Sequence, residues 1–233
     1  MSGGAGAHAA PAAGTGRAMD GLEGLNPEQR RAVEHTEGPV LILAGAGSGK
    51  TRTIAYRIAR LVGAGLAQER EILAVTFTNK AAEEMRQRVA GLLGHDVRGL
   101  WISTFHALCA KLLRREGPAI GLGRDFVIYD SADQQAAIKQ ALKDVNADDK
   151  LIPPRVALAR ISQAKNQMQG PEALAGGNAW NFRDQQIAKV YERYLAILKE
   201  SGAVDFDDLL LKTVELFEHD GVRAKYQDRK SVV

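Results

Sequence analysis

The sequence predicts an α/β protein, in which a parallel sheet carries helices on both faces and a mostly helical segment is inserted. Two observations support this prediction. Apolar runs at 40–43, 72–75 and 100–104 are each followed by a helical pattern, and β-then-α units in series are typical of a parallel sheet with right-handed crossovers. After a further apolar stretch at 125–129 the periodicity becomes almost purely helical, which indicates the insertion.

The first apolar run, at 40–43, contains no polar residue. An uninterrupted run of this kind is expected for a strand buried on both faces of a parallel sheet. Just before it, Asn26 as N-cap and Pro27 at the first helical position predict a short helix that ends before Gly38.

A glycine-rich stretch follows the first run and fits the phosphate-loop pattern, with an alanine in place of the usual first glycine. Its residues are Ala44, Gly45, Ala46, Gly47, Ser48, Gly49, Lys50 and Thr51. Small residues let backbone N–H groups surround phosphate oxygens, and the helix N-terminus that follows attracts anions. Lys50 is expected to reach the β- and γ-phosphates of ATP, and the Thr51 hydroxyl to bind Mg²⁺. The alternative is an ordinary glycine-rich loop, which the strand before it and the helix after it disfavour.

Capping residues predict where the later helices begin. They are Thr78 or Asn79, a capping box that opens at Ser131, the pair Pro153-Pro154, and Asp205. The last of these helices is predicted to extend to about Phe217. The carboxylates at its start, on Asp205, Asp207 and Asp208, could also hold a metal ion, but an N-cap and a first-turn acid explain most of them.

Length and composition limit the class of protein. The 233 residues, with 45% hydrophobic content, suffice for one large domain or two modest ones. No apolar run is long enough for a membrane span, and residues 1–21 read as a disordered tail and not as a signal peptide. A single cysteine, Cys109, excludes an internal disulfide framework and suits a reducing cytoplasm, the expected location. The net charge of +3 only mildly favours a polyanionic partner.

Five stretches, in order, resemble motifs of the N-terminal half of UvrD/Rep/PcrA-type superfamily I DNA helicases. They are Leu25 to Gln29 (the Q motif), Ala44 to Arg52 (Walker A), Val75 to Ala82 and Ile102 to Ala107 (two DNA-contacting motifs), and Asp205 to Leu209 (the return to the motor domain). The resemblance covers about residues 22 to 230, and in this family an alanine is common at the position of Ala44.

The resemblance implies a RecA-like P-loop NTPase domain that binds ATP and Mg²⁺. Gln29 is then expected to hydrogen-bond adenine, and Arg52 to stack on it. Single-stranded DNA is expected to contact Thr76, Phe77, Thr78, Asn79, Thr104 and His106. Considered alone, Phe77 could equally be a core residue, although an exposed ring past the end of a parallel strand could stack on a base. His106 alone would more often be a structural histidine.

The resemblance also implies a division into domains. Residues 22–115 are expected to be the first part of the RecA-like domain, residues 116–202 an inserted helical subdomain, and residues 203–233 a truncated return segment. The implied activity is ATP-dependent unwinding of DNA, 3′ to 5′, in DNA repair or replication. Single-stranded and duplex DNA are the implied partners, and repair or replication proteins are possible ones.

Two parts that such an activity requires are missing from the sequence. No apolar strand ends in Asp-Glu, the pair that holds Mg²⁺ and activates water, and the second RecA-like domain with its arginine finger is absent. The motor domain is therefore expected to be incomplete, and the 233 residues to bind nucleotide without hydrolysing it. Two alternatives remain: a non-catalytic nucleotide- or DNA-binding fragment, and the helicase part of a RecB/AddA-like helicase-nuclease. A small-molecule kinase fits less well, because it explains the loop alone.

Overall fold

The computed structural model describes residues 22, 24–45, 47–148, 150–176, 182–227 and 230–232, and every structural statement below concerns these residues. The chain forms two compact units, which are described separately. The first unit comprises residues 1–104 and 228–233, and the second unit comprises residues 105–227. The predicted tail at residues 1–21 lies outside the described residues.

A parallel sheet organises the first unit, with β1 (Ile72–Thr76) between β2 (Trp101–Thr104) and β5 (Lys230–Val232). The register pairs Leu73 with Trp101 and Thr76 with Thr104. Helix α3 (Asn79–Leu93) connects β1 to β2, so that β1, α3 and β2 form the expected crossover unit. The prediction of parallel strands at 72–75 and 100–104 is therefore confirmed.

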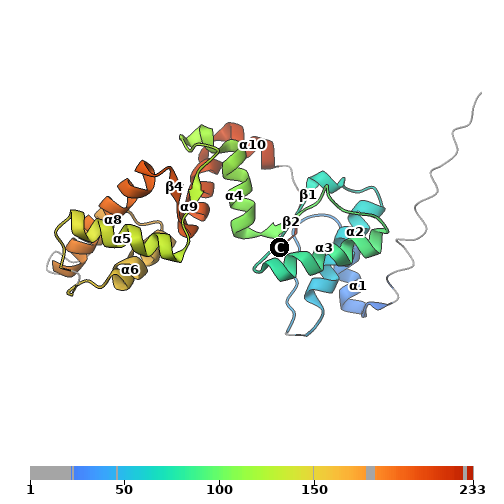
Figure 1. The fold of residues 1–233 in the computed structure, drawn as a ribbon. Coiled ribbons are helices and arrows are strands. Elements are labelled where there is room, and N and C mark those ends of the chain that lie inside the picture. Colours follow the sequence, from blue (N-terminus) through green and yellow to red (C-terminus); the bar gives the residue numbers. More distant parts are fainter. Residues whose placement is uncertain are drawn as a thin grey trace, which may run out of the picture. The chain divides into compact units, whose positions relative to one another are not determined.

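Two further helices complete the described part of the first unit, α1 (Pro27–Glu34) and α2 (Lys50–Gly63). Helix α2 packs between α1 and α3 (Figure 1). The apolar stripes of α2 and α3 meet the sheet in one core, which contains Ile58, Leu61, Ile72, Met85, Val89 and Ile102. Within each helix the buried residues recur at helical spacing, as expected for an inward face.

The predicted strand at 40–43 is wrong for the described structure. These residues form no strand, and the side chains of Leu41 and Leu43 are 83% and 86% exposed. The physical reason lies in the sheet, because a strand requires a neighbour's backbone to satisfy its hydrogen bonds. Both edges of β1 are paired, one to β2 and one to β5, and among the described residues the run at 40–43 pairs with neither outer edge of this sheet.

Helices dominate the second unit, as the change of periodicity predicted. Its helices are α4 (Phe105–Glu116), α5 (Ser131–Asp144), α6 (Pro154–Asn166), α7 (Pro171–Gly176), α8 (Phe182–Glu200), α9 (Phe206–Glu218) and α10 (Asp220–Gln227), with a 3₁₀ turn at Gly117–Ile120. The strands β3 (Val127–Ile128) and β4 (Ala203–Val204) pair in parallel. The apolar stretch predicted at 125–129 thus forms only a two-residue strand.

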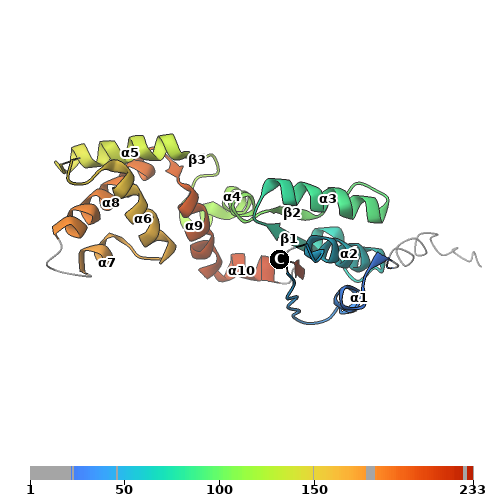
Figure 2. The ribbon, with the colours of Figure 1, turned by 90° about the horizontal axis from the view of Figure 1, so that it is seen from below.

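Helices α5, α6 and α8 lie against one another around one apolar core (Figure 2). Its buried members include Ile138, Leu142, Ile161, Ile187 and Tyr194. The start of α5 corrects a detail of the prediction, because the capping box opens at Asp130 and not at Ser131. The Asp130 carboxylate accepts the Asp133 N–H at 2.9 Å, and the Asp133 carboxylate accepts the Asp130 N–H at 3.1 Å.

The contacts group the chain differently from the expected boundaries at 115/116 and 202/203. Helix α4 packs along α9, and so both belong to the second unit. Helix α10, which the sequence did not predict, is joined to the end of α4: Glu116 Oε1 accepts from Lys225 Nζ at 2.5 Å and from the Tyr226 hydroxyl at 2.7 Å. These two bonds, the Lys225 bond first, hold the pKa of Glu116 below its ordinary value.

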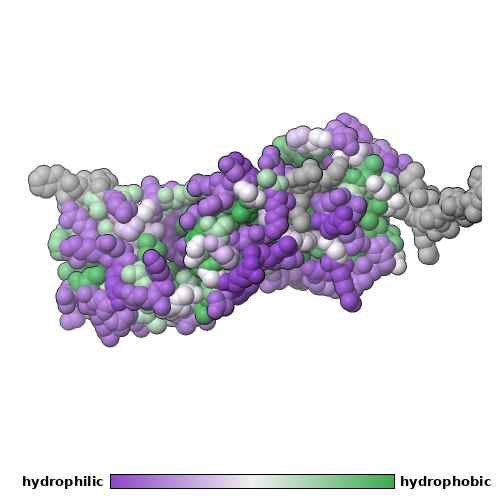
Figure 3. Space-filling view, turned by 90° about the horizontal axis from the view of Figure 1, so that it is seen from above, coloured by the Kyte–Doolittle hydropathy of each residue, from purple (hydrophilic) through white to green (hydrophobic). Residues whose placement is uncertain are grey.

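The surface of the described residues is mostly hydrophilic. Figure 3 shows one face, on which hydrophobic residues lie singly or in small groups among hydrophilic ones. Among the described helices, none combines the length and the apolar character that crossing a membrane requires. Cys109 is buried in α4.

Because the run at 40–43 is exposed, substitutions of two leucines in the first unit are expected to differ in their effect on the free energy of unfolding. Leu61→Ala, at a side chain only 3% exposed, is expected to lower the free energy of unfolding by about 2–5 kcal/mol. Leu41→Ala, at a side chain 83% exposed, is expected to change it by no more than about 0.5 kcal/mol. Urea unfolding followed by circular dichroism measures both; equal losses would show that the run is packed in solution.

Candidate nucleotide-binding loop and nucleic-acid interface

The glycine-rich loop takes its shape from two glycines with positive φ. Gly47 has φ 75° and Gly49 has φ 81°, in the region that favours glycine. A Cβ on Gly49 would lie 2.9 Å from Gln29 Nε2, the end of a side chain that can move, so it is the positive φ that favours glycine there. The Ser48 hydroxyl donates to the Gly45 carbonyl at 2.7 Å and braces the turn. Ala46, also predicted to line the loop, lies outside the described residues.

The ammonium of Lys50 lies inside the curve of this loop. Its Nζ donates to the carbonyl oxygens of Ala44 at 3.0 Å and of Gly45 at 2.7 Å. Lys50 is exposed, and no carboxylate pairs with it among the described residues. The Lys50 ammonium is therefore held by neutral carbonyl groups alone, and an anion could replace those groups.

The N-terminus of α2 faces the same loop. Its N-cap is Gly49, which has no side chain to accept the free N–H groups of the first turn, and that turn contains no acidic residue. A helix N-terminus left uncapped offers N–H donors and roughly half a positive charge to an anion. Thr51, the second residue of α2, lies half-buried at this end.

Gln29 connects α1 to the loop. Its backbone N–H donates to Asn26 Oδ1 at 2.8 Å, and its side-chain oxygen accepts the Asn26 N–H at 3.1 Å, which forms a capping box. Its Nε2 then donates to the Ser48 carbonyl at 2.9 Å. The Asn-x-x-Gln spacing was the signal in the sequence for the capping part of this role.

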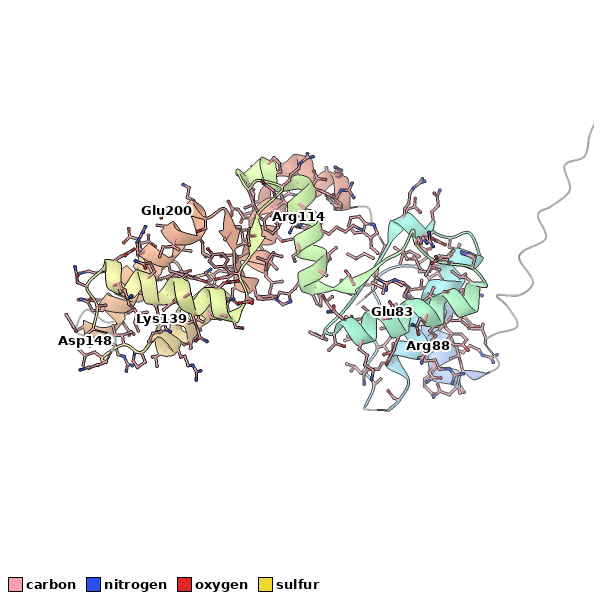
Figure 4. All side chains as sticks on the ribbon, viewed as in Figure 1. Glu83, Arg88, Arg114, Lys139, Asp148 and Glu200 are labelled. Carbon is pink, nitrogen blue, oxygen red and sulfur yellow. The ribbon has the colours of Figure 1, made fainter. Side chains whose placement is uncertain are left out.

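Arg52 lies beside Gln29 on the first turn of α2. Its guanidinium is 5.5 Å from the centre of the Tyr56 ring, one helical turn further on, and packs against Gly24. A shallow cavity of about 400 Å³ adjoins it, lined by Arg52, Tyr56, Arg88, Gly91 and Leu92. Figure 4 labels Arg88 on α3. Tyr56 was missed in the sequence, although its i+4 spacing from Arg52 predicts such a contact.

The second group of predicted residues follows β1. Phe77 is 90% exposed, so the alternative that it belongs to the core is wrong. Thr76 is buried, and its hydroxyl donates to the Thr78 carbonyl at 3.0 Å. Thr78 is the N-cap of α3, since its hydroxyl accepts the Ala81 N–H at 3.1 Å. The two threonines therefore fix the turn that presents Phe77 and Asn79 to solvent.

Thr104 lies at the same edge of the sheet, because the parallel register pairs it with Thr76. Carboxyl ends of parallel strands meet at one edge, where open α/β sheets bind ligands. The structure therefore brings together Thr76, Phe77, Thr78, Asn79 and Thr104.

His106 belongs to the second unit, in the first turn of α4, and is exposed. Its ring lies 5.9 Å from the ring of Phe206, with an interplanar angle of 68°, an edge-to-face contact. Phe206 is the first residue of α9 and is 47% exposed. No local pattern in the sequence indicates this pair, because the two residues are far apart along the chain.

The carboxylates at the start of α9 bind a lysine. Lys165 Nζ lies 2.7 Å from Asp205 Oδ2 and 2.8 Å from Asp208 Oδ1, and the three side chains are at most 9% exposed. The Tyr194 hydroxyl donates to Asp205 Oδ2 at 2.9 Å. Burial raises the pKa of Asp208, an effect that the Lys165 ammonium opposes, and burial followed by the Asp205 charge raises the pKa of Tyr194.

This lysine decides between the two interpretations of the acidic cluster. Asp205 is the N-cap of α9 and accepts the Asp208 N–H at 2.8 Å, as the capping interpretation predicted. Among the described residues, no group of three or more His, Cys, Asp or Glu side chains could hold a metal ion. The ammonium of Lys165 occupies the position between the carboxylates that a cation would take.

Mn²⁺ added to the chain is therefore expected to leave the amide NMR signals of Phe206 and Asp208 unbroadened. A carboxylate pair that already holds a buried ammonium between its oxygens offers a divalent cation little gain. The amide of Ile138, buried in α5, serves as the reference for non-specific relaxation. Saturable broadening confined to the start of α9 would mean that the cluster holds metal after all.

Comparisons with known proteins agree with the order of the motifs. The family model described as UvrD/REP helicase N-terminal domain matches residues 25–233. The ATP-dependent DNA helicase PcrA of Leuconostoc citreum is 49% identical over 210 residues, 88% of this chain and 28% of that protein. The proteins of the same name from Bacillus subtilis and Staphylococcus epidermidis are 45% and 44% identical over 90% of this chain. The chain spans 28% of the length of each of these relatives.

Proposed function

Because the chain belongs to the UvrD/REP helicase N-terminal domain family, we propose that it is the ATP- and DNA-binding N-terminal part of an ATP-dependent DNA helicase. The observation that carries this proposal is the loop at 44–51, which curls around the Lys50 ammonium next to an uncapped helix N-terminus. The relatives are named ATP-dependent DNA helicases, which suggests the reaction. The loop contains the groups that would bind the phosphates of the nucleotide.

The residues present fit ATP and Mg²⁺. In the proposed complex, Lys50 exchanges the Ala44 and Gly45 carbonyls for phosphate oxygens, and the N–H groups at the start of α2 bind the same phosphates. Thr51 supplies a hydroxyl to Mg²⁺, which neutralises phosphate charge. Gln29 and Arg52 lie on the adjoining side of Gly49, within reach of the adenine ring. The first turn of α2 contains no carboxylate to repel the phosphates.

Lys50→Ala is expected to weaken binding of a fluorescent ATP analogue, in the presence of Mg²⁺, by at least about tenfold, because it removes the only side-chain cation inside the loop. Fluorescence anisotropy measures the loss. Lys139→Ala is the matched control, since Lys139 lies exposed on α5 of the second unit (Figure 4). Equal affinities for wild type and Lys50→Ala would eliminate the loop as the nucleotide site.

We further propose that these 233 residues bind ATP without turning it over. Hydrolysis in this class of loop needs a second carboxylate site that holds Mg²⁺ and activates water. The 233 residues contain no Asp-Glu pair after an apolar run. DNA-stimulated ATP hydrolysis that disappears in Lys50→Ala would overturn this part of the proposal and leave the binding part standing.

The proposed contact with single-stranded DNA is centred on Phe77. An exposed ring just past a parallel strand can stack on a base, and the polar groups of Thr78, Asn79 and Thr104 lie at the same edge of the sheet. His106 is proposed as a further contact, from the second unit, where it donates to a phosphate near the N-terminus of α4.

Phe77→Ala is expected to raise the dissociation constant for a fluorescent oligothymidine by about 5- to 150-fold, the equivalent of the ~1–3 kcal/mol that one stacked base contributes. Phe182→Ala is the matched control, because Phe182 is also a largely exposed phenylalanine (66%) but opens α8 of the second unit. Equal losses in the two variants would show that exposed aromatic area, and not the position of Phe77, determines affinity.

For the longer protein we propose unwinding of duplex DNA with 3′ to 5′ polarity, in repair or replication, by a RecA-like motor to which residues 22–115 and 203–233 contribute and into which residues 116–202 are inserted. The support is the ordered set of five motifs and the relatives' names. The exposed apolar run at 40–43 is proposed to join the sheet of that complete domain, since its composition suits a strand buried on both faces.

A further inference from the structure

We propose that Lys165 is a positioning residue for the nucleic-acid interface: its buried ammonium fixes the start of α9 and, through Phe206, the orientation of the His106 imidazole. The proposal rests on the proposed function in one respect only, that His106 contacts DNA. The link itself, from Lys165 to His106, lies entirely within the second unit.

The first step of the link is a buried ionic network. Lys165 is 1% exposed at the C-terminal end of α6, and it lies between the carboxylates of Asp205 and Asp208, at 2.7 and 2.8 Å. The three groups carry one positive and two negative charges when ionised, so the carboxylates depend on the ammonium and on their hydrogen bonds to remain buried. Removing Lys165 alone would leave two like charges facing each other.

The second step fixes the direction of Asp205. Its Oδ1 accepts the Asp208 N–H at 2.8 Å, which caps α9, while its Oδ2 accepts from both Lys165 Nζ and the Tyr194 hydroxyl. The two oxygens of one carboxylate therefore bind different elements, α9 on one side and α6 and α8 on the other. The first turn of α9 cannot rotate without breaking bonds that are buried and charge-assisted.

The third step passes from α9 to α4. Phe206 directly follows Asp205, and its ring meets the His106 ring edge-to-face at 5.9 Å. Helices α4 and α9 pack along each other, and the Thr213 side chain hydrogen-bonds Cys109 further along the same interface. His106 is exposed, so few other contacts restrain its ring, and Phe206 is the aromatic neighbour that the structure gives it.

In this proposal the network orients the His106 ring as well as stabilising the fold, and two variants separate these two roles. Replacing a whole buried ionic network by neutral groups is often neutral or stabilising, whereas removing one partner costs about 3–5 kcal/mol. The triple variant Lys165→Met, Asp205→Asn, Asp208→Asn removes every charge of the network and keeps Asn, a preferred N-cap, at the start of α9. Tyr194→Phe removes a single hydrogen bond to Asp205 Oδ2 and is the milder variant.

The test follows the His106 ring directly, in the 233-residue chain with isotope-labelled histidine. Phe206→Ala defines the NMR shift of the His106 ring protons without the Phe206 ring current. The triple variant is expected to move these signals most of the way to that value, and Tyr194→Phe to move them partly. Lys139→Met, at an exposed lysine of α5 (Figure 4), is expected to leave them at the wild-type position.

A second measurement connects position to binding. The triple variant is expected to weaken oligothymidine binding by about tenfold, or about 1.4 kcal/mol, with the affinity for the ATP analogue unchanged, because the loop belongs to the first unit. Unchanged His106 signals in a folded triple variant overturn the inference, as do unchanged signals in Tyr194→Phe if the triple variant does not fold. Shifted His106 signals in a chain that does not bind DNA uphold the positioning role and reject the proposed DNA contact.

Discussion

The parallel pairing of β1 on both its edges is the constraint on which the described first unit depends. With β2 on one side and β5 on the other, the register sets Thr76 beside Thr104 and brings the residues after β1 to one edge of the sheet. The apolar run at 40–43 pairs with none of these strands in the described structure and lies exposed, although its composition suits a buried strand. One set of backbone hydrogen bonds thus determines the arrangement of the candidate interface.

The second unit is distinguished by charged side chains that are buried. A helical core of apolar side chains surrounds Lys165, Asp205 and Asp208, and the cost of removing three charges from water is offset only because each ion has charged or hydrogen-bonding partners within 3 Å. Since these partners come from α6, α8 and α9, the network joins three helices of the second unit.

The sequence predicted the features that depend on local pattern. The capping residues Asn26, Thr78 and Asp205 correctly predicted the starts of α1, α3 and α9. Features that depend on distant contacts were missed or wrong. The run at 40–43 required knowledge of which strands flank β1, Phe206 meets His106 across a hundred residues, and the partner of the Asp205 carboxylate lies forty residues away in α6. The roles assigned to the loop and to the DNA-contacting residues remain predictions.

The bonds that Lys50 makes to the Ala44 and Gly45 carbonyls give the loop an internal ligand of its own. An anion that enters must displace these carbonyls from the ammonium, so its measured affinity is a difference between two sets of hydrogen bonds and not the strength of one. In the proposed complex, the cost of breaking the two Lys50–carbonyl bonds is therefore expected to lower the affinity for an anion below what the new contacts alone would give.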